Sequence, residues 1–227
     1  PAAADAGATT TALRLEAIAD GLRAASCPPG TAFAMLPPIP LDATPVSLEN
    51  IDADTDLPGA VFDGGWHLAS PDPAFGGLSG LAARGDGALL AVTDRGAFVT
   101  IELRDGAPVA ARLAPMAPAA AGGKDDRDAE GLALYDGLAL VSFEHRHRVL
   151  AFDLDGCGAA AQGETVAAFG DAVRGLSRPL AANGGAEGLA LAPGGELILA
   201  LETEDGGLPL ARLAEDGTAA VSTRIAP

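Results

Sequence analysis

The chain has 227 residues, of which 48% are hydrophobic and only 4% aromatic, and its formal net charge at pH 7 is −17. This apolar content indicates a globular protein rather than a disordered one. The negative charge repels nucleic-acid phosphates and anionic lipids, and no apolar run approaches the roughly 20 residues of a membrane span. We therefore expect no nucleic acid and no membrane among its partners.

The N-terminal region has no regular pattern. Residues 1–10 are small and polar, and we predict a disordered tail there. Apolar residues in 11–25 fit both the helical and the strand period, and we favour a strand followed by a turn. Prolines make 28–45 an extended, irregular connector, and 61–69 is typical of a strand.

A short phrase then recurs three times, and each copy is followed by an apolar run that ends in an acid. The phrases and their acids are Leu78–Ala82 with Asp94, Ala129–Ala133 with Glu144, and Ala186–Ala190 with Glu202. The second residue of each phrase precedes its acid by 15, 14 and 15 residues, and successive phrases lie 51 and 57 residues apart. This period is close to that of the four-stranded blades of β-propellers.

Each repeat contains four predicted strands joined by short turns rich in glycine. The predicted strands are 78–82, 88–94, 97–103 and 108–113; 129–135, 138–144, 148–154 and 164–169; and 186–192, 197–202, 209–213 and 219–225. A parallel α/β fold would need helices of about ten residues between strands, which these segments are too short to form. We predict an all-β fold, a β-propeller of four-stranded antiparallel blades, with about three full blades and an N-terminal part-blade in one domain over 11–227.

The repeated acids are expected to meet at one end of the propeller. Paired residues in an antiparallel hairpin have a constant index sum, and three pairs are centred on predicted turns. These pairs are Ser79–Asp94, Glu130–Glu144 and Glu187–Glu202. Because the first strand of each blade lines the central axis, we predict that these side chains lie opposite each other at one mouth of the channel.

Carboxylates placed opposite each other on paired strands lower stability unless they are compensated. A hard divalent cation such as Ca²⁺ would compensate them, as would a shared proton or the nearby Arg95, Arg127 or Arg146. A structural role, in which each acid accepts backbone N–H bonds and fixes its blade, stays open. The predicted metal ligands are Asp94, Asp128, Glu130, Glu144, Glu187 and Glu202.

His145 and His147 form a His-x-His pair, a spacing that can bind a transition metal. No third ligand lies nearby in sequence, so we favour an exposed pair without a bound metal. His145 adjoins Glu144 and is a candidate proton carrier. Ser79 lacks the strand-to-helix context of a nucleophilic serine, so we predict a blade-fixing or ligand-facing role for it.

Two features bear on the compartment. Cys27 and Cys157 form either one disulfide, which requires an oxidising compartment, or two unrelated small hydrophobic side chains. Residues 1–7 resemble the polar segment that follows signal-peptide cleavage. We expect an exported protein, periplasmic or secreted, with its signal peptide already removed.

Several stretches, in order, are similar to a known family. They are FGGLSGL (75–81) with VTDRG (92–96), DAEGLA (128–133) with SFE (142–144), and NGGAEGL (183–189). Over about residues 60–205 the chain resembles the bacterial phytase-like family described as having esterase-like activity of phytase. The resemblance implies a β-propeller, Ca²⁺ dependence, export and hydrolysis of phosphate or carboxylate esters. A closed ring of that type needs about six blades, so we expect this chain to supply part of one.

The functional prediction is a metal-assisted hydrolase that acts on a small anionic ester. The six acids would hold Ca²⁺, Arg95, Arg127 or Lys124 would steady a phosphate, and His145 would carry a proton. The first alternative is a non-catalytic propeller that binds a ligand or partner at the same mouth. A lactonase-like propeller with one divalent ion is the second alternative.

Overall fold

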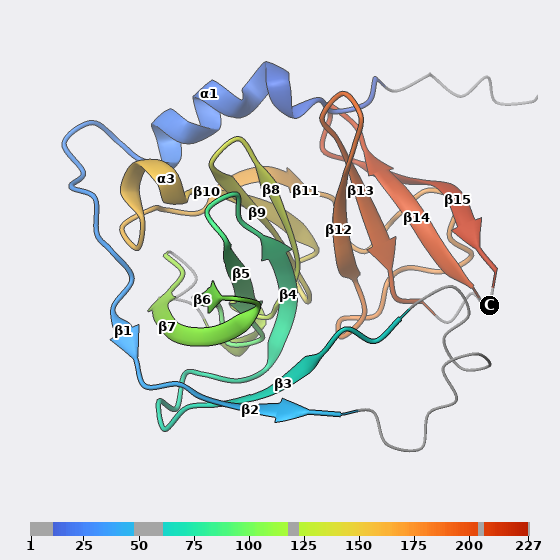
Figure 1. Ribbon diagram of the computed structural model, residues 1–227. Helices are drawn as coiled ribbons and strands as arrows, with labels where there is room; N and C mark the ends of the chain where they lie inside the picture. Colours follow the sequence, from blue (N-terminus) through green and yellow to red (C-terminus); the bar gives the residue numbers. More distant parts are fainter. Residues whose placement is uncertain (1–10, 48–60, 118–122, 204–206, 227) are drawn as a thin grey trace, which may run out of the picture.

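The computed structural model describes residues 11–47, 61–117, 123–203 and 207–226. It contains three antiparallel sheets built from consecutive strands and a separate two-stranded sheet (Figure 1). The first sheet has β4 (Leu78–Ala83), β5 (Ala88–Thr93), β6 (Ala97–Arg104) and β7 (Ala107–Pro115), with β1 (Pro38–Ile39) beside β7. The second has β8 (Ala129–Tyr135), β9 (Leu138–Phe143), β10 (Arg148–Asp153) and β11 (Glu164–Ala168). The third has β12 (Ala186–Ala192), β13 (Glu196–Leu201), β14 (Leu208–Leu213) and β15 (Ala219–Ile225).

The two-stranded sheet pairs β2 (Asp42–Val46) with β3 (Gly65–Ala69). Three four-stranded units and a smaller N-terminal sheet confirm the predicted all-β fold with propeller blades. The predicted strand over 61–69 begins only at Gly65, and the predicted tail over 1–10 lies outside the described residues.

Two residues of positive φ form the tight hairpin turn in the second sheet. Asp136 and Gly137 have φ of 45° and 83°, the left-handed region that a two-residue hairpin turn requires at both positions. Between the third and fourth strands of the first sheet, Asp105 and Gly106 repeat this, with φ of 51° and 78°. The Asp-Gly dipeptides therefore set the register of these hairpins.

The glycine of the repeated phrase lets successive sheets approach each other. The first strands of the three sheets, β4, β8 and β12, are neighbours. Strand β8 contacts β4 on one side and β12 on the other, and the three lie side by side in Figure 1. A Cβ on Gly80 would lie 2.7 Å from the carbonyl oxygen of Glu130, and one on Gly131 would lie 2.9 Å from the backbone nitrogen of Leu189. A larger side chain at either position would push the neighbouring inner strand away.

A β-bulge in each inner hairpin overturns the predicted opposite pairs. Leu78 pairs with Thr93 but Gly80 pairs with Val92, so the register shifts by one residue at Ser79. The same shift occurs in the second and third sheets, where Glu130 and Glu187 take the place of Ser79. The ladder next to each turn is already one residue out of register with the prediction, and the extra residue of the bulge adds a second residue to this shift.

The acids at the strand ends consequently lie opposite the residue that precedes each phrase. The backbone N–H groups of Asp94, Glu144 and Glu202 donate to the carbonyl oxygens of Gly77, Asp128 and Gly185, at 2.9, 3.0 and 2.9 Å. The second residue of each phrase is the extra residue of the bulge, and it has no partner in the strand pairing. A bulge bends its strand and redirects such a side chain, which here is Ser79, Glu130 or Glu187.

The strand and turn predicted for 11–25 are wrong. Residues 15–26 form the helix α1 (Leu15–Ser26), whose buried face is formed by Leu15, Ala19, Leu22 and Ser26 at helical spacing. This face packs on β10 and β11. The alternation of Leu13 and Leu15 reflects a short extended stretch before the helix, in which the Leu13 N–H donates to the carbonyl oxygen of Leu213 at 3.0 Å.

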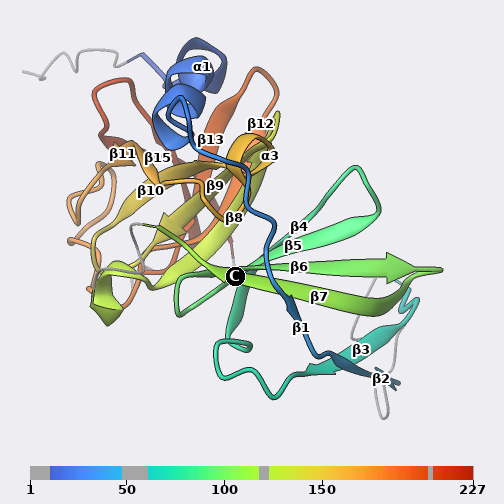
Figure 2. The same ribbon diagram turned by 90° about the vertical axis from the view of Figure 1, so that its left-hand side faces the viewer.

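The N-terminal segment crosses all three sheets (Figure 2). Residues 11–15 bond to the third sheet, α1 covers the second, and β1 pairs with β7 of the first. The connector predicted over 28–45 is extended, as expected, but it is not irregular throughout, since β1 and part of β2 lie in it. Prolines are tolerated in these short edge strands because such strands have N–H groups without a ladder partner.

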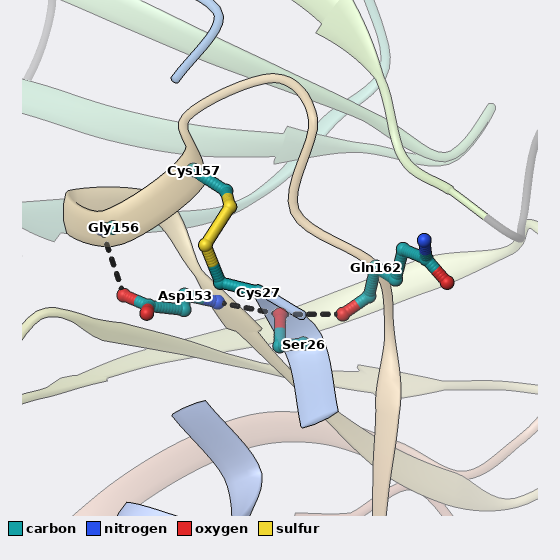
Figure 3. The surroundings of a disulfide bond; sticks show 6 residues. All are labelled: Ser26, Cys27, Asp153, Gly156, Cys157 and Gln162. Carbon is teal, nitrogen blue, oxygen red and sulfur yellow. Dashed lines mark hydrogen bonds between the residues drawn. A yellow bond between two sulfur atoms is a disulfide. The ribbon is translucent and has the colours of Figure 1, made fainter. Parts of the chain in front are cut away.

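A disulfide holds this segment to the second sheet and decides between the two interpretations of the cysteines. Cys27, directly after α1, is bonded to Cys157 at the end of the short helix α3 (Leu154–Cys157) (Figure 3). Beside it, the Ser26 hydroxyl donates to the carbonyl oxygen of Gln162 at 2.6 Å and accepts the backbone N–H of Asp153 at 2.9 Å. None of the described helices, which include the short 3-10 helix η2 (Lys124–Asp126), has the length and hydropathy of a membrane span.

Candidate functional site

The repeated acids gather at the end of the sheets that faces away from α1. The hairpin turns of the second and third sheets lie at the α1 end, because Arg23 pairs with Asp136 and the Leu15 N–H donates to the carbonyl oxygen of Gly195. The inner strands therefore begin at the opposite end, where the phrases are. The bulge at the start of each inner strand re-aims its second side chain there.

Three glutamates from two neighbouring sheets form the first group. Glu130 lies in the bulge of β8, Glu144 directly follows β9, and Glu187 lies in the bulge of β12. One carboxylate oxygen of each lies within 4.8 Å of the others. The predicted convergence of these acids is present, although the contact runs between sheets as well as within one hairpin.

Burial and mutual repulsion change the ionisation of this group. The pKa of Glu187 is raised to about 8, first by burial, then by a hydrogen bond to Glu144 and by the charges of Glu130, Glu144 and Glu202. Burial also raises the pKa of Glu130, and the charges of Glu144, Asp128 and Asp94 add to this, while a hydrogen bond from Ser79 opposes it. At neutral pH and without a cation, this raised pKa favours the protonated form of Glu187.

Arginine does not compensate this group in the described part of the chain. Arg146 and Arg148 instead both approach Asp126, with nitrogen–oxygen distances of 2.9 and 3.7 Å. The Oε1 atom of Glu187 is buried, and among the described residues it has no hydrogen-bond partner. An orphaned carboxylate oxygen beside two further carboxylates is a donor set that suits a cation.

A second group shares Glu144. Asp128, Glu144 and His145 each place one donor atom within 4.8 Å of the others, and His145 Nε2 lies 3.3 Å from Asp128 Oδ2. Asp128 is 6% exposed and Glu144 is 9% exposed. The favoured prediction of an exposed histidine pair is wrong for His147, which is 3% exposed and stacks on Phe169.

Four of the predicted site residues lie outside both groups. Asp94 and Glu202 are near enough for their charges to raise the pKa values of Glu130 and Glu187, respectively, but neither belongs to a group within 4.8 Å. Arg95 donates to the carbonyl oxygen of Pro73 and also places its Nε 3.9 Å from Asp94 Oδ1. Arg127 Nε donates to the carbonyl oxygen of Gly123 at 3.3 Å. Both arginines are thus bonded to backbone carbonyls, and Arg95 also lies beside one of the predicted acids.

Ser142 is a residue of the site that the sequence did not reveal. Its hydroxyl is fully buried, accepts the backbone N–H of Gly131 at 2.8 Å, and donates to the carbonyl oxygen of Ala186 at 2.6 Å. It therefore bonds an N–H at the bulge of β8 and joins the second sheet to the third beside Glu187. A polar residue in an apolar run, where the other repeats have Val92 and Ala200, was the available signal.

A cavity of about 280 Å³ adjoins Glu202 at the end of the third sheet. Its lining includes Arg178, Asn183, Glu202 and Thr203, which come from the long connector before β12 and from the end of β13. The same connector touches the second group, because the backbone N–H of His145 donates to the carbonyl oxygen of Ala182 at 2.9 Å. The cavity thus brings a cationic side chain to the acidic end of the molecule.

The comparison with family models decides the family. The model described as "Phytase-like: Esterase-like activity of phytase" matches residues 73–225, which include all three four-stranded sheets. The chain belongs to this phytase-like family. The resemblance expected from the motifs is therefore confirmed. No curated protein matches the sequence.

Among solved structures, one similar chain is the extracellular domain of the protein assigned as hybrid two component system BT4673 from B. thetaiotaomicron. The sequence identity is 12% and the TM-score is 0.35, and the match covers 63% of this phytase-like chain. It covers 15% of the other chain, so this chain corresponds to a small part of that protein. The TM-score is too low to indicate a shared fold, and nothing about function follows from it.

Proposed function

We propose that this phytase-like chain hydrolyses phosphate or carboxylate esters with a divalent cation held by Glu130, Glu144 and Glu187. The observation that carries the proposal is the approach of these three carboxylates to within 4.8 Å, with a buried, unpaired oxygen on Glu187. An all-oxygen donor set of this kind suits Ca²⁺. When bound, such an ion polarises an ester oxygen and makes water more acidic.

The protein groups would prepare the site by moving protons. Without a cation, Glu187 holds a proton because its pKa is raised to about 8, and it would release that proton when a cation binds. His145 adjoins Glu144, and its Nε2 faces Asp128, so its other nitrogen, Nδ1, would be the atom that carries a proton to or from the substrate.

The proposed substrate is a small anionic ester. The cavity beside Glu202 would receive it, and Arg178 in the cavity lining would attract its negative charge. Arg95, whose side chain is 62% exposed, and Arg127 would add to this attraction from the first sheet and the loop before β8. A bound cation would also offset the repulsion expected from a chain with a net charge of −17.

Turnover of p-nitrophenyl phosphate and p-nitrophenyl acetate, with Ca²⁺ and with EDTA, tests the proposal. We expect turnover of at least one ester with Ca²⁺, its loss in EDTA, and a loss of about 100-fold or more in Glu130→Gln and Glu187→Gln, as for removal of a group that stabilises transition-state charge. Glu16→Gln, which removes an exposed carboxylate on α1, is the control and should retain wild-type turnover. Full turnover in EDTA would contradict the metal role.

If the protein hydrolyses neither ester but still binds Ca²⁺, the non-catalytic alternative would be favoured. In that case the same acids would orient a bound ligand or partner. The two functions are therefore separated by one assay and one binding measurement on the same variants.

We further propose that the protein works in an oxidising compartment, secreted or periplasmic. The Cys27–Cys157 disulfide supports this, because such bonds persist mainly outside the cytosol. Thiol labelling of the protein isolated from its source, with and without reductant, tests the proposal. Two reactive thiols before reduction would contradict it.

A further inference from the structure

The histidine of the second group gives it a donor set different from that of the three glutamates. The first group offers oxygen alone, whereas the second offers two carboxylates and the imidazole of His145. Calcium prefers oxygen ligands, whereas imidazole is a ligand of zinc and other transition-metal ions. Within this group, Asp128 and Glu144 supply the second and third donors beside His145.

We propose that Asp128, Glu144 and His145 form a second metal site, which binds a divalent transition-metal ion such as Zn²⁺. It is distinct from the all-oxygen group and is coupled to it through the shared Glu144. The inference deepens the proposed function, since it adds a second ion at the same end of the sheets, and with that ion bound His145 would act as a ligand in place of a proton carrier. The binding of the ion does not depend on ester hydrolysis.

The backbone around these ligands is tied down on both sides. Glu144 is held to Asp128 by the 3.0 Å hydrogen bond between their backbones, and His145 is held to Ala182 of the next connector. His145 has φ of 53°, a conformation that only a few per cent of residues other than glycine adopt. The ligand positions are thus fixed before any ion arrives, which lowers the entropic cost of binding.

Exposure in this group allows an ion to enter from one side. The side chain of Asp128 is only 9% exposed, whereas that of His145 is 24% exposed. A transition-metal ion such as Zn²⁺ would therefore reach the imidazole of His145 first. The 3.3 Å contact between Asp128 and His145 would then be replaced by one bond from each residue to the metal.

A second observation points to a ligand on the Glu144 side of the group. His147 is 3% exposed, and its Nδ1 has no hydrogen-bond partner among the described residues. A Cβ placed on Gly185 would lie 3.3 Å from His147 Nδ1 and 3.7 Å from Glu144 Cγ, so both border the same small space. This buried imidazole nitrogen, which borders the same space as the side chain of Glu144, is a polar atom that an ion or its bound water would satisfy.

The two arginines nearest the group in the chain approach a different acid. Arg146 and Arg148 both pair with Asp126, although they flank His147 in the chain. Glu144 belongs to both groups, so its negative charge would be shared between the two ions. A simple Asp128–His145 hydrogen bond without a metal is the competing interpretation, and it predicts no saturable metal binding.

Titration of the full chain with Co²⁺, followed by visible absorption, tests the site, because Co²⁺ substitutes for Zn²⁺ and is coloured. We expect one saturable Co²⁺ site whose spectrum is abolished by Zn²⁺. His145→Asn, chosen because asparagine tolerates positive φ, should weaken Co²⁺ binding by about 100-fold or more. His67→Asn, which removes the exposed histidine of β3, is the matched control and should bind Co²⁺ like the wild type.

Two glutamate variants separate this inference from the proposed function. Glu187→Gln should lose Ca²⁺ affinity while keeping its Co²⁺ spectrum, whereas Glu144→Gln should weaken the binding of both ions. Co²⁺ binding without any Ca²⁺ binding would support the second site and contradict the all-oxygen site. Co²⁺ binding that is unchanged in His145→Asn would overturn the second site.

A measurement on the wild type tests the site without relying on the folding of any variant. Addition of Zn²⁺ should shift the imidazole resonances of His145 in a saturable way and leave those of His67 in place. The absence of a saturable shift at His145, or equal shifts at both histidines, would also overturn the inference.

Discussion

The hydroxyl of Ser142 in β9 donates a 2.6 Å hydrogen bond to the carbonyl oxygen of Ala186, the first residue of β12. This bond joins the second sheet to the third directly beside the residue that carries the orphaned carboxylate, Glu187. The same hydroxyl accepts the N–H of Gly131 at the bulge of β8. One buried side chain thus fixes the two bulges from which Glu130 and Glu187 project.

Ser142→Ala should therefore lower both stability and cation affinity. The substitution leaves the Gly131 N–H and the Ala186 carbonyl oxygen buried without their partner, which costs about 1–3 kcal/mol of unfolding free energy. Urea unfolding and Ca²⁺ titration measure the two effects. Ser222→Ala, which removes an exposed hydroxyl bonded to Leu210 within the third sheet, should change neither by much. Equal behaviour of the two variants would show that Ser142 does not position the site.

The close approach of the inner strands predicts different costs for equivalent glycines. Gly131→Ala would place a Cβ 2.6 Å from Ser142 Oγ and 2.9 Å from the Leu189 nitrogen, and we expect a loss of about 1–3 kcal/mol. Gly188→Ala, at the same position of the third phrase, meets only Ala200 Cβ at 3.0 Å and should cost less. Thermal unfolding of both variants tests this order, and a reversed order would contradict the packing described here.

The disulfide should account for a large part of the stability. It closes a loop with a sequence separation of 130, and removing such a bond costs about 2–5 kcal/mol. We expect dithiothreitol to lower the urea midpoint of the wild type. A Cys27→Ala and Cys157→Ala double variant should start at the lower midpoint and not respond to dithiothreitol. If dithiothreitol does not change the urea midpoint of the wild type, the other contacts of α1 are sufficient to hold it.

The raised pKa of Glu187 predicts the pH dependence of the metal-free protein. A carboxyl with a folded pKa of about 8 and an ordinary unfolded value near 4.5 adds stability that is complete below the unfolded pKa and is lost as the pH rises through the folded pKa. In EDTA, the unfolding free energy of the wild type should therefore fall, relative to Glu187→Gln, from about pH 5 to pH 8. Glu130 adds to this fall because its pKa is raised too.

The control for this experiment is Glu16→Gln, whose curve should run parallel to that of the wild type. A difference between wild type and Glu187→Gln that stays constant with pH would mean that Glu187 is ionised in the folded protein. In saturating Ca²⁺ the fall should disappear, because the cation replaces the proton.

The repeats were predictable because their signals are local. Strand bounds followed from alternation and from dipeptides such as Asp136-Gly137, whose positive φ values the structure confirms. The helix at 15–26 was missed because Leu13 and Leu15 alternate in the extended stretch that precedes it, whereas its buried face is defined by packing on β10 and β11. Tertiary contacts decided between two periods that the sequence fits equally well.

The site was predictable in composition but not in pairing. The acids were identified from their recurrence, yet a constant index sum placed Glu130 opposite Glu144, and the bulge instead directs Glu130 toward both Glu144 and Glu187 of the next sheet. The contact between Asp128 and His145 depends on the chain reversing after β9, and the role of Ser142 depends on the neighbouring sheet. Neither relation is encoded in a spacing along one strand.

The binding of Ca²⁺ by calorimetry, measured near pH 7 in buffers of different ionisation enthalpy, tests the central claim most directly. Our account predicts one site that binds Ca²⁺ with release of about one proton, because Glu187 is protonated before the ion binds. Glu187→Gln should lose both the affinity and the proton release. Absence of Ca²⁺ binding in the wild type, or binding that survives in Glu187→Gln with the same proton release, would contradict it.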